Sequence, residues 1–349
     1  MHDFWNGRRI LITGHTGFKG SWLAFWLKML GAEVCGYALA PEGSPNLFEN
    51  LRLETQINSV VGDIRDLSAF EKTLQAFQPE IVFHLAAQSL VRKSYREPIE
   101  TYTTNVTGTI NILEAIRQTD FVKSVVIVTT DKVYENKEWH WAYRETERLG
   151  GFDPYSNSKA CAELAVAAYR NSFYADRETL IATARAGNVI GGGDWSEDRL
   201  LPDVFRSLVF GDKLEIRNPH SIRPWQHALE PLAGYLKLAE KLYAGEKTFA
   251  DAWNFGPADE DSKSVGWILE EIKRVWNEPV NWEIAEGRQP HEARLLKLDS
   301  AKAKSELHWS PRLSLAEAIS LTTEWYRAFK NKADLTETTR RQIEFYMNK

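Results

Sequence analysis

The sequence predicts an α/β fold in which a doubly wound parallel sheet is followed by a smaller α+β lobe. Short runs rich in β-branched residues alternate with longer segments whose apolar residues recur at helical spacing. The short runs are apolar throughout, as expected of strands that helices cover on both faces. After about residue 190 the pattern changes to short strands scattered among helices, which indicates a second lobe.

Six runs in the first part of the chain are predicted strands, and the stretches between them are predicted helices. The runs are RRILITG (8–14), AEVCGYAL (32–39), INSVVG (57–62), EIVFHLAA (80–87), SVVIVTT (124–130) and LIATARAGN (180–188). Further along, short strands are expected in LEIRN (214–218), AWNFGP (252–257) and VNWEIA (280–285), and helices near 202–210, 228–244, 263–276 and 314–330. We therefore expect one domain over 1–187 and a second mainly over 188–349, some segments of which return to the first.

The composition favours a small-molecule partner. With 43 basic and 48 acidic side chains, a net charge of -5 and no block of like charge, neither nucleic acid nor a membrane surface is expected. No apolar run approaches a membrane span, and MHDFWNGRR lacks the apolar core of a signal peptide, so a cytoplasmic protein is expected. Cys35 and Cys161 lack metal-ligand spacing, so no metal site is expected.

A glycine-rich turn follows the first predicted strand. Gly14, Gly17 and Gly20 form a GxxGxxG pattern before an apolar-faced helix, which is typical of dinucleotide binding. Glycines permit a tight turn, and the N–H groups of the helix N-terminus suit a pyrophosphate. His15 and Lys19 either add positive charge at that pyrophosphate or are solvated on the rim of the loop.

The second predicted strand does not settle the choice between NAD and NADP. It ends in Tyr37, Ala38 and Leu39, so the acidic residue that would hold the ribose of NAD is missing. No basic residue follows before Arg52, although Lys19 could contact a 2′-phosphate. Asp63, after the third strand, is either a partner for the adenine amino group or a turn aspartate.

A tyrosine and a lysine share one helix face. Asp153 can cap a helix with Pro154 in its first turn, which places Tyr155 and Lys159 four residues apart. To act as a base near neutral pH, a phenol of pKa about 10 must be lowered to about 7, which requires roughly 4 kcal/mol. A neighbouring ammonium and a positive nicotinamide ring are suitable sources of that stabilisation.

Together these motifs resemble the extended short-chain dehydrogenase/reductase family, which has a Rossmann-like fold. The resemblance rests on the glycine pattern, Asp63, HLAA (84–87), Asn105 in TNVTGT, a strand ending in Thr130, and YxxxK. Within the family, TTDKVY is similar to the Thr-Asp-Glu motif of nucleotide-sugar 4,6-dehydratases, with lysine in the glutamate position. GHTGFKGSWL, RAGNVIGGGDW and IRNPHSIRPWQHALEP resemble the branch that acts on CDP-glucose.

The resemblance implies an NAD-dependent conversion of CDP-D-glucose to CDP-4-keto-6-deoxy-D-glucose and water, with NADP not excluded. Tyr155 would take the proton from the sugar O4, with Lys159 lowering its pKa and Thr130 bonding the same oxygen. Asp131 would protonate the departing C6 hydroxyl, which needs a raised pKa. Lys132 would either remove the C5 proton, after losing its own proton through desolvation, or stabilise the enolate.

Further contacts are implied by the same resemblance, as is a homodimer or higher homo-oligomer. For each arginine the alternative is a salt bridge, and for Tyr95 it is helix packing. Expected cofactor contacts, besides the catalytic pair, are Gly14, His15, Thr16, Gly17, Phe18, Lys19, Asp63, Ile64, Leu85, Ala86, Ala87 and Thr104. Expected substrate contacts are Gln88, Tyr95, Asn188, Asp194, Arg199, Leu200, Arg217, Arg223, Arg288 and His291.

Two other functions remain open at this stage. A nucleotide-sugar 4-epimerase shares the transient C4 ketone but needs no acid at C6, and it typically has Ser or Ala where Asp131 and Lys132 stand. A nucleotide-sensing protein without catalysis could use the same fold, although Thr130, Tyr155 and Lys159 argue against it.

Overall fold

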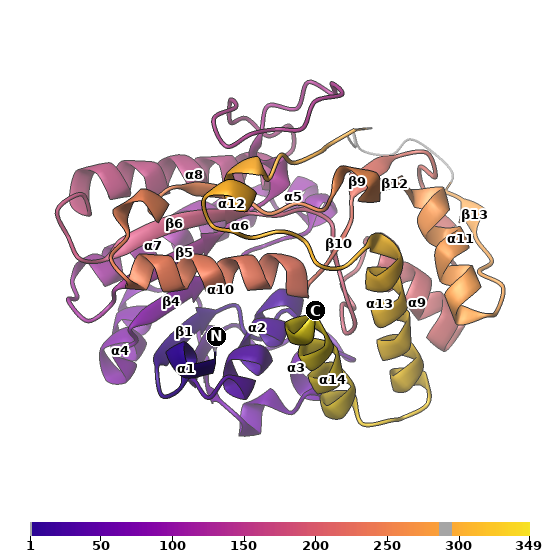
Figure 1. The fold of residues 1–349 in the computed structure, drawn as a ribbon, viewed down its shortest axis with the longest axis horizontal. Coiled ribbons are helices and arrows are strands. Elements are labelled where there is room, and N and C mark those ends of the chain that lie inside the picture. Colours follow the sequence, from indigo (N-terminus) through magenta and orange to yellow (C-terminus); the bar gives the residue numbers. More distant parts are fainter. Residues whose placement is uncertain (1, 286–294) are drawn as a thin grey trace.

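The computed structural model describes residues 2–285 and 295–349, and a seven-stranded parallel sheet runs through it (Figure 1). The strand order is β11-β6-β5-β4-β1-β2-β3, so the order reverses between β1 and β4. This confirms the predicted fold class and all six strands of the first part. The strands are β1 (Arg9–Thr13), β2 (Glu33–Ala38), β3 (Asn58–Val61), β4 (Ile81–His84), β5 (Ser124–Val128), β6 (Leu180–Arg185) and β11 (Ala252–Asn254).

Two apolar layers cover the sheet, because successive strand residues point to opposite faces. In β1, Ile10 and Ile12 join the core under α2 (Phe18–Met29) and α10 (Leu229–Tyr243), while Leu11 joins the other core. That second core lies under α4 (Leu67–Phe77), α7 (Gly108–Arg117) and α8 (Pro154–Phe173). Short elements complete this part: α1 (His2–Trp5), α3 (Leu47–Asn50), α5 (Val91–Arg96), α6 (Pro98–Tyr102) and a π-helical turn, Thr103–Thr107.

The second lobe consists of helices and very short strand pairs. Trp195, Phe205, Tyr326 and Phe329 form an aromatic cluster between its helices, and this cluster is continuous with the core under α2. The helices are α9 (Leu200–Phe210), α11 (Val265–Trp276), α12 (Ala301–Ser305), α13 (Leu315–Lys330) and α14 (Leu335–Asn348). The strand pairs are β7 (Val189–Ile190) with β10 (Gln226–His227), β8 (Glu215–Ile216) with β13 (Glu283–Ile284), and β9 (Ile222–Pro224) with β12 (Ser262–Ser264).

Several elements differ from the sequence-based expectation, and two of them affect the architecture most. The strand expected in 252–257 was placed among the short strands of the second lobe, but β11 is the edge strand of the main sheet, parallel to β6. The chain reaches it through α10, which packs on β5 and β6 and so returns the chain to the first domain. Helix α14 was not anticipated, because mostly polar residues surround the few apolar residues it buries, such as Ile343 and Tyr346.

Within the described residues, no helix combines the length and the apolar character needed to cross a membrane. Cys35 is a buried free thiol and Cys161 a partly buried one. In the same ranges, no group of three or more His, Cys, Asp or Glu side chains is arranged to hold a metal ion.

Candidate functional site

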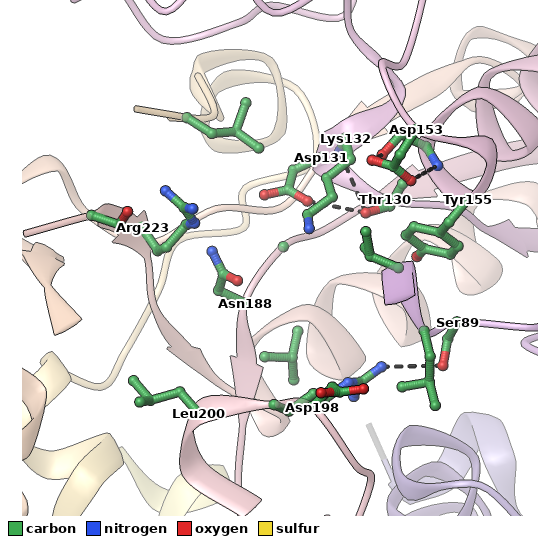
Figure 2. Close-up of a pocket in the computed structure, with 18 of the residues that line it drawn as sticks. Ser89, Thr130, Asp131, Lys132, Asp153, Tyr155, Asn188, Asp198, Leu200 and Arg223 are labelled. Atoms are coloured by element: carbon green, nitrogen blue, oxygen red, sulfur yellow. Dashed lines mark hydrogen bonds between the residues drawn. The ribbon is translucent and has the colours of Figure 1, made fainter. Parts of the chain in front are cut away.

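A cavity of about 600 Å³ lies between the lobes, beyond the carboxyl ends of the central strands (Figure 2). Thr129–Lys132, which follow β5, form one wall, and Ala186–Asn188, which follow β6, form the next. The second lobe contributes Arg199 and Arg223. Parallel α/β sheets bind ligands at this edge, so the position agrees with the expected site.

The segment after β5 brings an acid into the cavity in a buried position. The Asp131 side chain is 1% exposed, and the Thr130 hydroxyl donates to its Oδ1 at 3.0 Å. Its Oδ2 has no partner among the described residues. Burial raises the pKa of Asp131, and the positive charge of Lys132 and the bond from Thr130 oppose this only in part. A buried carboxyl of this kind is suited to hold a proton and donate it.

Gly187 allows this placement of Asp131. A Cβ at Gly187 would lie 1.8 Å from Asp131 Oδ2, so any side chain there would displace the carboxyl. Lys132 is only partly buried, and Figure 2 shows its amine in the same cavity beside the Asp131 carboxyl. The Lys132 amine can therefore reach the same ligand as the Asp131 carboxyl.

Tyr155 reaches the cavity from the first turn of α8. Asp153 caps this helix, since its Oδ1 accepts the Ser156 N–H at 2.9 Å and its Oδ2 accepts the Ser156 hydroxyl at 2.6 Å. Tyr155 is 8% exposed, and burial raises its pKa to about 12, against a smaller opposing effect of a hydrogen bond with Thr130.

Lys159 lies one helical turn after Tyr155 and is 4% exposed. Its amine donates to the Val128 carbonyl at 3.0 Å, and burial lowers its pKa to about 7. The expected lowering of the phenol pKa by this lysine is therefore not present in the protein alone. The pKa of Tyr155 can fall only when positive charge is added nearby, for example when bound ligands favour the protonated form of Lys159.

The glycine turn has the geometry that a dinucleotide requires. Gly14 has φ +78°, and a Cβ there would lie 2.6 Å from the Ala86 nitrogen. A Cβ at Gly20 would lie 2.0 Å from the Gly14 carbonyl oxygen, so close packing of the turn on α2 requires both glycines. Gly17 is the N-cap of α2 and supplies no side-chain cap, which leaves the N–H groups of the first turn for an anion.

Two side chains of this turn differ from the expectation. His15 is fully buried, its Nε2 lies 2.7 Å from Ser59 Oγ, and burial lowers its pKa to about 4. It is therefore neutral, and neither expected role, as a cation or as a solvated side chain, fits. Lys19 lines the cavity and is not on a solvated rim; burial and the nearby Arg199 lower its pKa to about 8.

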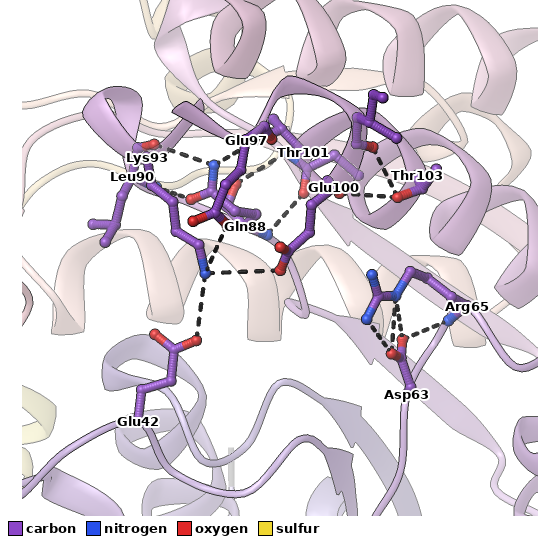
Figure 3. Close-up of polar contacts among 12 residues, drawn as sticks. Glu42, Asp63, Arg65, Gln88, Leu90, Lys93, Glu97, Glu100, Thr101 and Thr103 are labelled. Carbon is purple, nitrogen blue, oxygen red and sulfur yellow. Dashed lines mark hydrogen bonds and ion pairs between the residues drawn. The ribbon is translucent and has the colours of Figure 1, made fainter. Parts of the chain in front are cut away.

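Asp63 is already engaged within its own turn (Figure 3). Its Oδ1 accepts the Arg65 backbone N–H at 2.9 Å, and its Oδ2 accepts Arg65 Nη2 at 2.5 Å. The hydrogen bond with Arg65 lowers the pKa of Asp63. This geometry fits the turn-aspartate alternative, and the adenine contact stays a prediction.

The remaining residues expected at the cofactor lie along one edge of the sheet. Leu85 and Ala86 extend β4 by donating their backbone N–H groups to the Thr13 carbonyl and hydroxyl. Phe18 lines the cavity, whereas the Thr16 hydroxyl donates to the Leu39 carbonyl at 3.0 Å. Ala87 follows the same β4 segment, Thr104 lies in the π-helical turn, and Ile64 packs where a Cβ on Gly108 would stand.

Gln88 and Tyr95, expected at the substrate, do not line the cavity. The Gln88 amide donates to the Thr101 hydroxyl at 2.8 Å and accepts the Leu90 N–H at 2.6 Å, so internal bonds already occupy it (Figure 3). Tyr95 is 40% exposed. These bonds of Gln88 stabilise the loop that follows β4, and its contact with the substrate stays a prediction.

The second lobe places polar groups opposite Asp131. The Asn188 Nδ2 is buried without a partner in the described part of the chain, and Asn188 has φ +41°. Arg223 faces Asp131 across the cavity and lowers its pKa slightly (Figure 2). The unpaired Asn188 amide suggests that a ligand oxygen completes this wall.

An ion pair crosses the mouth of the cavity. Arg199 Nη1 lies 3.1 Å from Asp194 Oδ2, and its Nη2 donates to Ser89 Oγ at 3.1 Å, so it links the lobes. Leu200 begins α9 in the same wall, and Arg217 donates to the Asp198 carbonyl at 2.9 Å. Arg288 and His291 lie outside the described residues.

Among the residues of the cavity that sequence reasoning missed, two contribute to the chemistry of the site. Ser221 lines it with a buried hydroxyl that has no partner among the described residues. No motif marks this serine. Gly187 is visible in the sequence as part of ARAGNV, but only the structure shows that it makes room for Asp131.

This fold and cavity define the class of nucleotide-sugar dehydratases and epimerases. The chain matches the family described as GDP-mannose 4,6 dehydratase over residues 11–322, and it belongs to that family. It is 50% identical to a CDP-glucose 4,6-dehydratase of Salmonella typhimurium, over 99% of this chain and 98% of the relative. A dTDP-glucose 4,6-dehydratase of Streptomyces griseus is 28% identical over 92% of this chain and 95% of its own length.

Solved structures share the fold. A UDP-glucose 4-epimerase of Thermotoga maritima, solved with UDP-glucose, superposes with a TM-score of 0.80 at 23% identity, covering 92% of this chain and 99% of its own. A dTDP-glucose 4,6-dehydratase of Bacillus anthracis, solved with NAD, gives a TM-score of 0.78 at 22% identity, covering 94% of this chain and 99% of its own.

Proposed function

We infer that this protein converts CDP-D-glucose to CDP-4-keto-6-deoxy-D-glucose and water with NAD as its cofactor. The observation that carries this inference is the 50% identity, over 99% of the chain, to a CDP-glucose 4,6-dehydratase. The cavity agrees with it, because Asp131 and Lys132 lie there together with Tyr155. An elimination of water needs an acid that a simple redox cycle does not need.

The residues present fit the cofactor. The N–H groups at the start of α2 suit its pyrophosphate, and the close packing around Gly14 and Gly20 keeps the backbone near it. When bound there, the nicotinamide of NAD would supply the hydride acceptor for the sugar C4 and the hydride donor for C6. Lys19, which lines the cavity, suits the negative charge of the ligands' phosphates.

Tyr155 serves as the base for the O4 proton. Its phenol adjoins the Thr130 hydroxyl, and the hydrogen bond between them opposes part of the rise in the phenol pKa. The pKa of about 12 must fall before the phenol can act, and Arg199 already acts in that direction. Protonation of Lys159, the cation one turn along α8, adds to this effect.

Asp131 serves as the acid for the C6 hydroxyl. Thr130 occupies Oδ1, so the unpartnered Oδ2 carries the proton toward the cavity. The Lys132 amine, which lies in the same cavity, accepts the C5 proton, and the electron pair of the broken C–H bond leaves negative charge on the O4 enolate. The ammonium group formed in this step then stabilises that negative charge.

Groups of the second lobe hold the nucleotide. Asn188 and Arg223 face the diphosphate, because the Asn188 amide has no partner in the described residues and a guanidinium can bond two phosphate oxygens. The cavity walls beyond these two residues are formed by the Arg199–Asp194 ion pair and by Leu200 and Arg217. In this proposal residues 1–187 hold the cofactor, and residues 188–349 mainly hold the substrate.

We propose a homodimer in the cytoplasm. Two apolar side chains on neighbouring helices support the dimer: Ile99 in α6 is 79% exposed and Leu164 in α8 is 59% exposed. Burying such side chains between two copies is favourable. The two free thiols are compatible with a reducing compartment.

One incubation tests the function. The protein is mixed with CDP-glucose and NAD in deuterated water, with NADP and with UDP-, GDP- and dTDP-glucose in parallel. We expect a 4-keto-6-deoxy product that absorbs in alkali and carries deuterium at C5. CDP-galactose without label would identify a 4-epimerase, and no turnover of any sugar would support a binding protein.

A further inference from the structure

A second cavity, of about 260 Å³, lies apart from the catalytic one. It forms where the loop 308–312 meets α2, α10 and α14, and none of its lining residues lines the first cavity. Its volume is below the roughly 300–1,000 Å³ of typical ligand pockets. It therefore suits a molecule of one or two rings and is too small for a dinucleotide or a nucleotide sugar.

The inner wall of this second cavity is aromatic and buried. Trp26 is 0%, Trp309 2% and Tyr346 1% exposed. Trp26 and Tyr346 meet edge to face, with ring centroids 5.7 Å apart. Flat apolar molecules pack well against such walls.

One donor of this wall is unsatisfied. The Trp309 indole N–H donates to the Glu230 carbonyl at 3.1 Å, and the Tyr346 hydroxyl donates to Glu230 Oε2 at 2.8 Å. The Trp26 Nε1–H, in contrast, is buried without an acceptor in the described ranges. A buried donor without a partner costs free energy, so an acceptor brought by a ligand would be stabilising.

Two cations lie at the cavity without a carboxylate between them. Lys237 donates to the His308 carbonyl at 2.5 Å, and Arg312 Nη1 donates to the Tyr346 carbonyl at 3.1 Å. Among the residues that the structure describes, neither forms an ion pair. Burial and the positive charge of Arg312 lower the pKa of Lys237. The Glu230 carboxylate interacts with the Arg312 charge, but its oxygens already accept the backbone N–H groups of Arg312 and Leu313 and the Tyr346 hydroxyl. Glu240 opposes the lowering of the Lys237 pKa, without forming an ion pair with Lys237 in the described residues.

We propose that this cavity binds a small organic anion with a flat apolar body. Its carboxylate or phosphate lies at Lys237 and Arg312, and its ring lies against Trp26 and Tyr346. Such a site is separate from the catalytic cavity, and its existence does not depend on the proposed function.

The test uses two anionic probes and one neutral probe of the same shape: 2-naphthyl phosphate, 2-naphthoate and 2-naphthol. Equilibrium dialysis is performed on the full chain with NAD and CDP present, so that these ligands compete for the first cavity. We expect one saturable site per chain for an anionic probe and at least about tenfold weaker binding of 2-naphthol. The tighter of the two anions shows whether a phosphate or a carboxylate is preferred.

Variants locate the binding. Lys237→Gln and Arg312→Gln should each weaken the anion about tenfold. The control is Lys241→Gln, one turn farther along α10, where the lysine pairs with Glu246 at 2.9 Å; its affinity should not change. The unfolding midpoint of each variant confirms that it is folded. No saturable binding, equal binding of 2-naphthol, or unchanged affinity in the folded Lys237→Gln variant would overturn the proposal.

Discussion

Replacing Asp131 with Asn tests the proposed acid most directly. The amide keeps the size of the carboxyl, and its oxygen can still accept the Thr130 hydroxyl that now bonds Oδ1 at 3.0 Å. The amide NH₂ then takes the position of Oδ2, where it can hydrogen-bond the C6 hydroxyl but cannot transfer a proton. General acid catalysis contributes about 10²–10⁴-fold. Because hydrogen bonding survives, we expect a loss of about 10²-fold, or roughly 3 kcal/mol in the barrier.

Stability should change in the opposite direction. Burial raises the pKa of Asp131 in the folded state, so above its unfolded pKa the unfolded chain releases this proton more readily, and folding is disfavoured. A neutral Asn removes this penalty, and the urea midpoint at neutral pH should rise. Product formation is followed by absorbance in alkali, and CDP-glucose binding by calorimetry. Asp251→Asn is the control, since Asp251 pairs with Arg170 and Lys302 away from the cavity. An undiminished elimination rate in Asp131→Asn would refute the acid assignment.

Three further predictions follow from the same geometry. Burial lowers the pKa of Lys159 from 10.5 to about 7, so between these pH values the unfolded chain binds more protons than the folded protein. The free energy of unfolding should therefore rise with pH across this interval. Lys159→Met should remove that rise, as measured in urea titrations, and should abolish turnover. Gly187→Ala should displace the Asp131 carboxyl, costing about 1–3 kcal/mol in urea titrations and most of the elimination rate in the alkali assay, and full activity would contradict the geometry. Arg185 and Glu163 form an ion pair at 2.9 Å, and their side chains are only 4% and 3% exposed. Arg185→Met leaves the Glu163 carboxylate buried without its ion partner, so the free energy of unfolding in urea titrations should fall by about 3–5 kcal/mol. A loss below about 1 kcal/mol would contradict this.

The sequence predicts the features that depend on residues close together in the chain. The GxxGxxG turn and the four-residue spacing of Tyr155 and Lys159 follow from local backbone geometry, and the structure brings Tyr155 to the cavity with Thr130 and Asp131. Apolar runs likewise predict the six strands of the first part, because burial on both faces requires apolar residues at every position.

Burial and pairing depend on distant residues, and there the sequence is insufficient. His15 is neutral because Ser59 and the core surround it, and Gln88 is occupied because Thr101 lies against it. The role of β11 depends on α10, which carries the chain back to β6. The second cavity has no motif, because Trp26, Lys237 and Tyr346 converge only in the folded chain.

The position of β11 limits how the protein can be divided. A polypeptide that stopped at residue 187 would leave the backbone of β6 without its outer neighbour, which β11 provides through register pairs such as Ala252 with Thr183. An exposed edge of this kind recruits strands from other molecules. Expression of residues 1–187 alone should therefore give a fragment that self-associates. The two parts of the chain should function only when they are joined in one polypeptide.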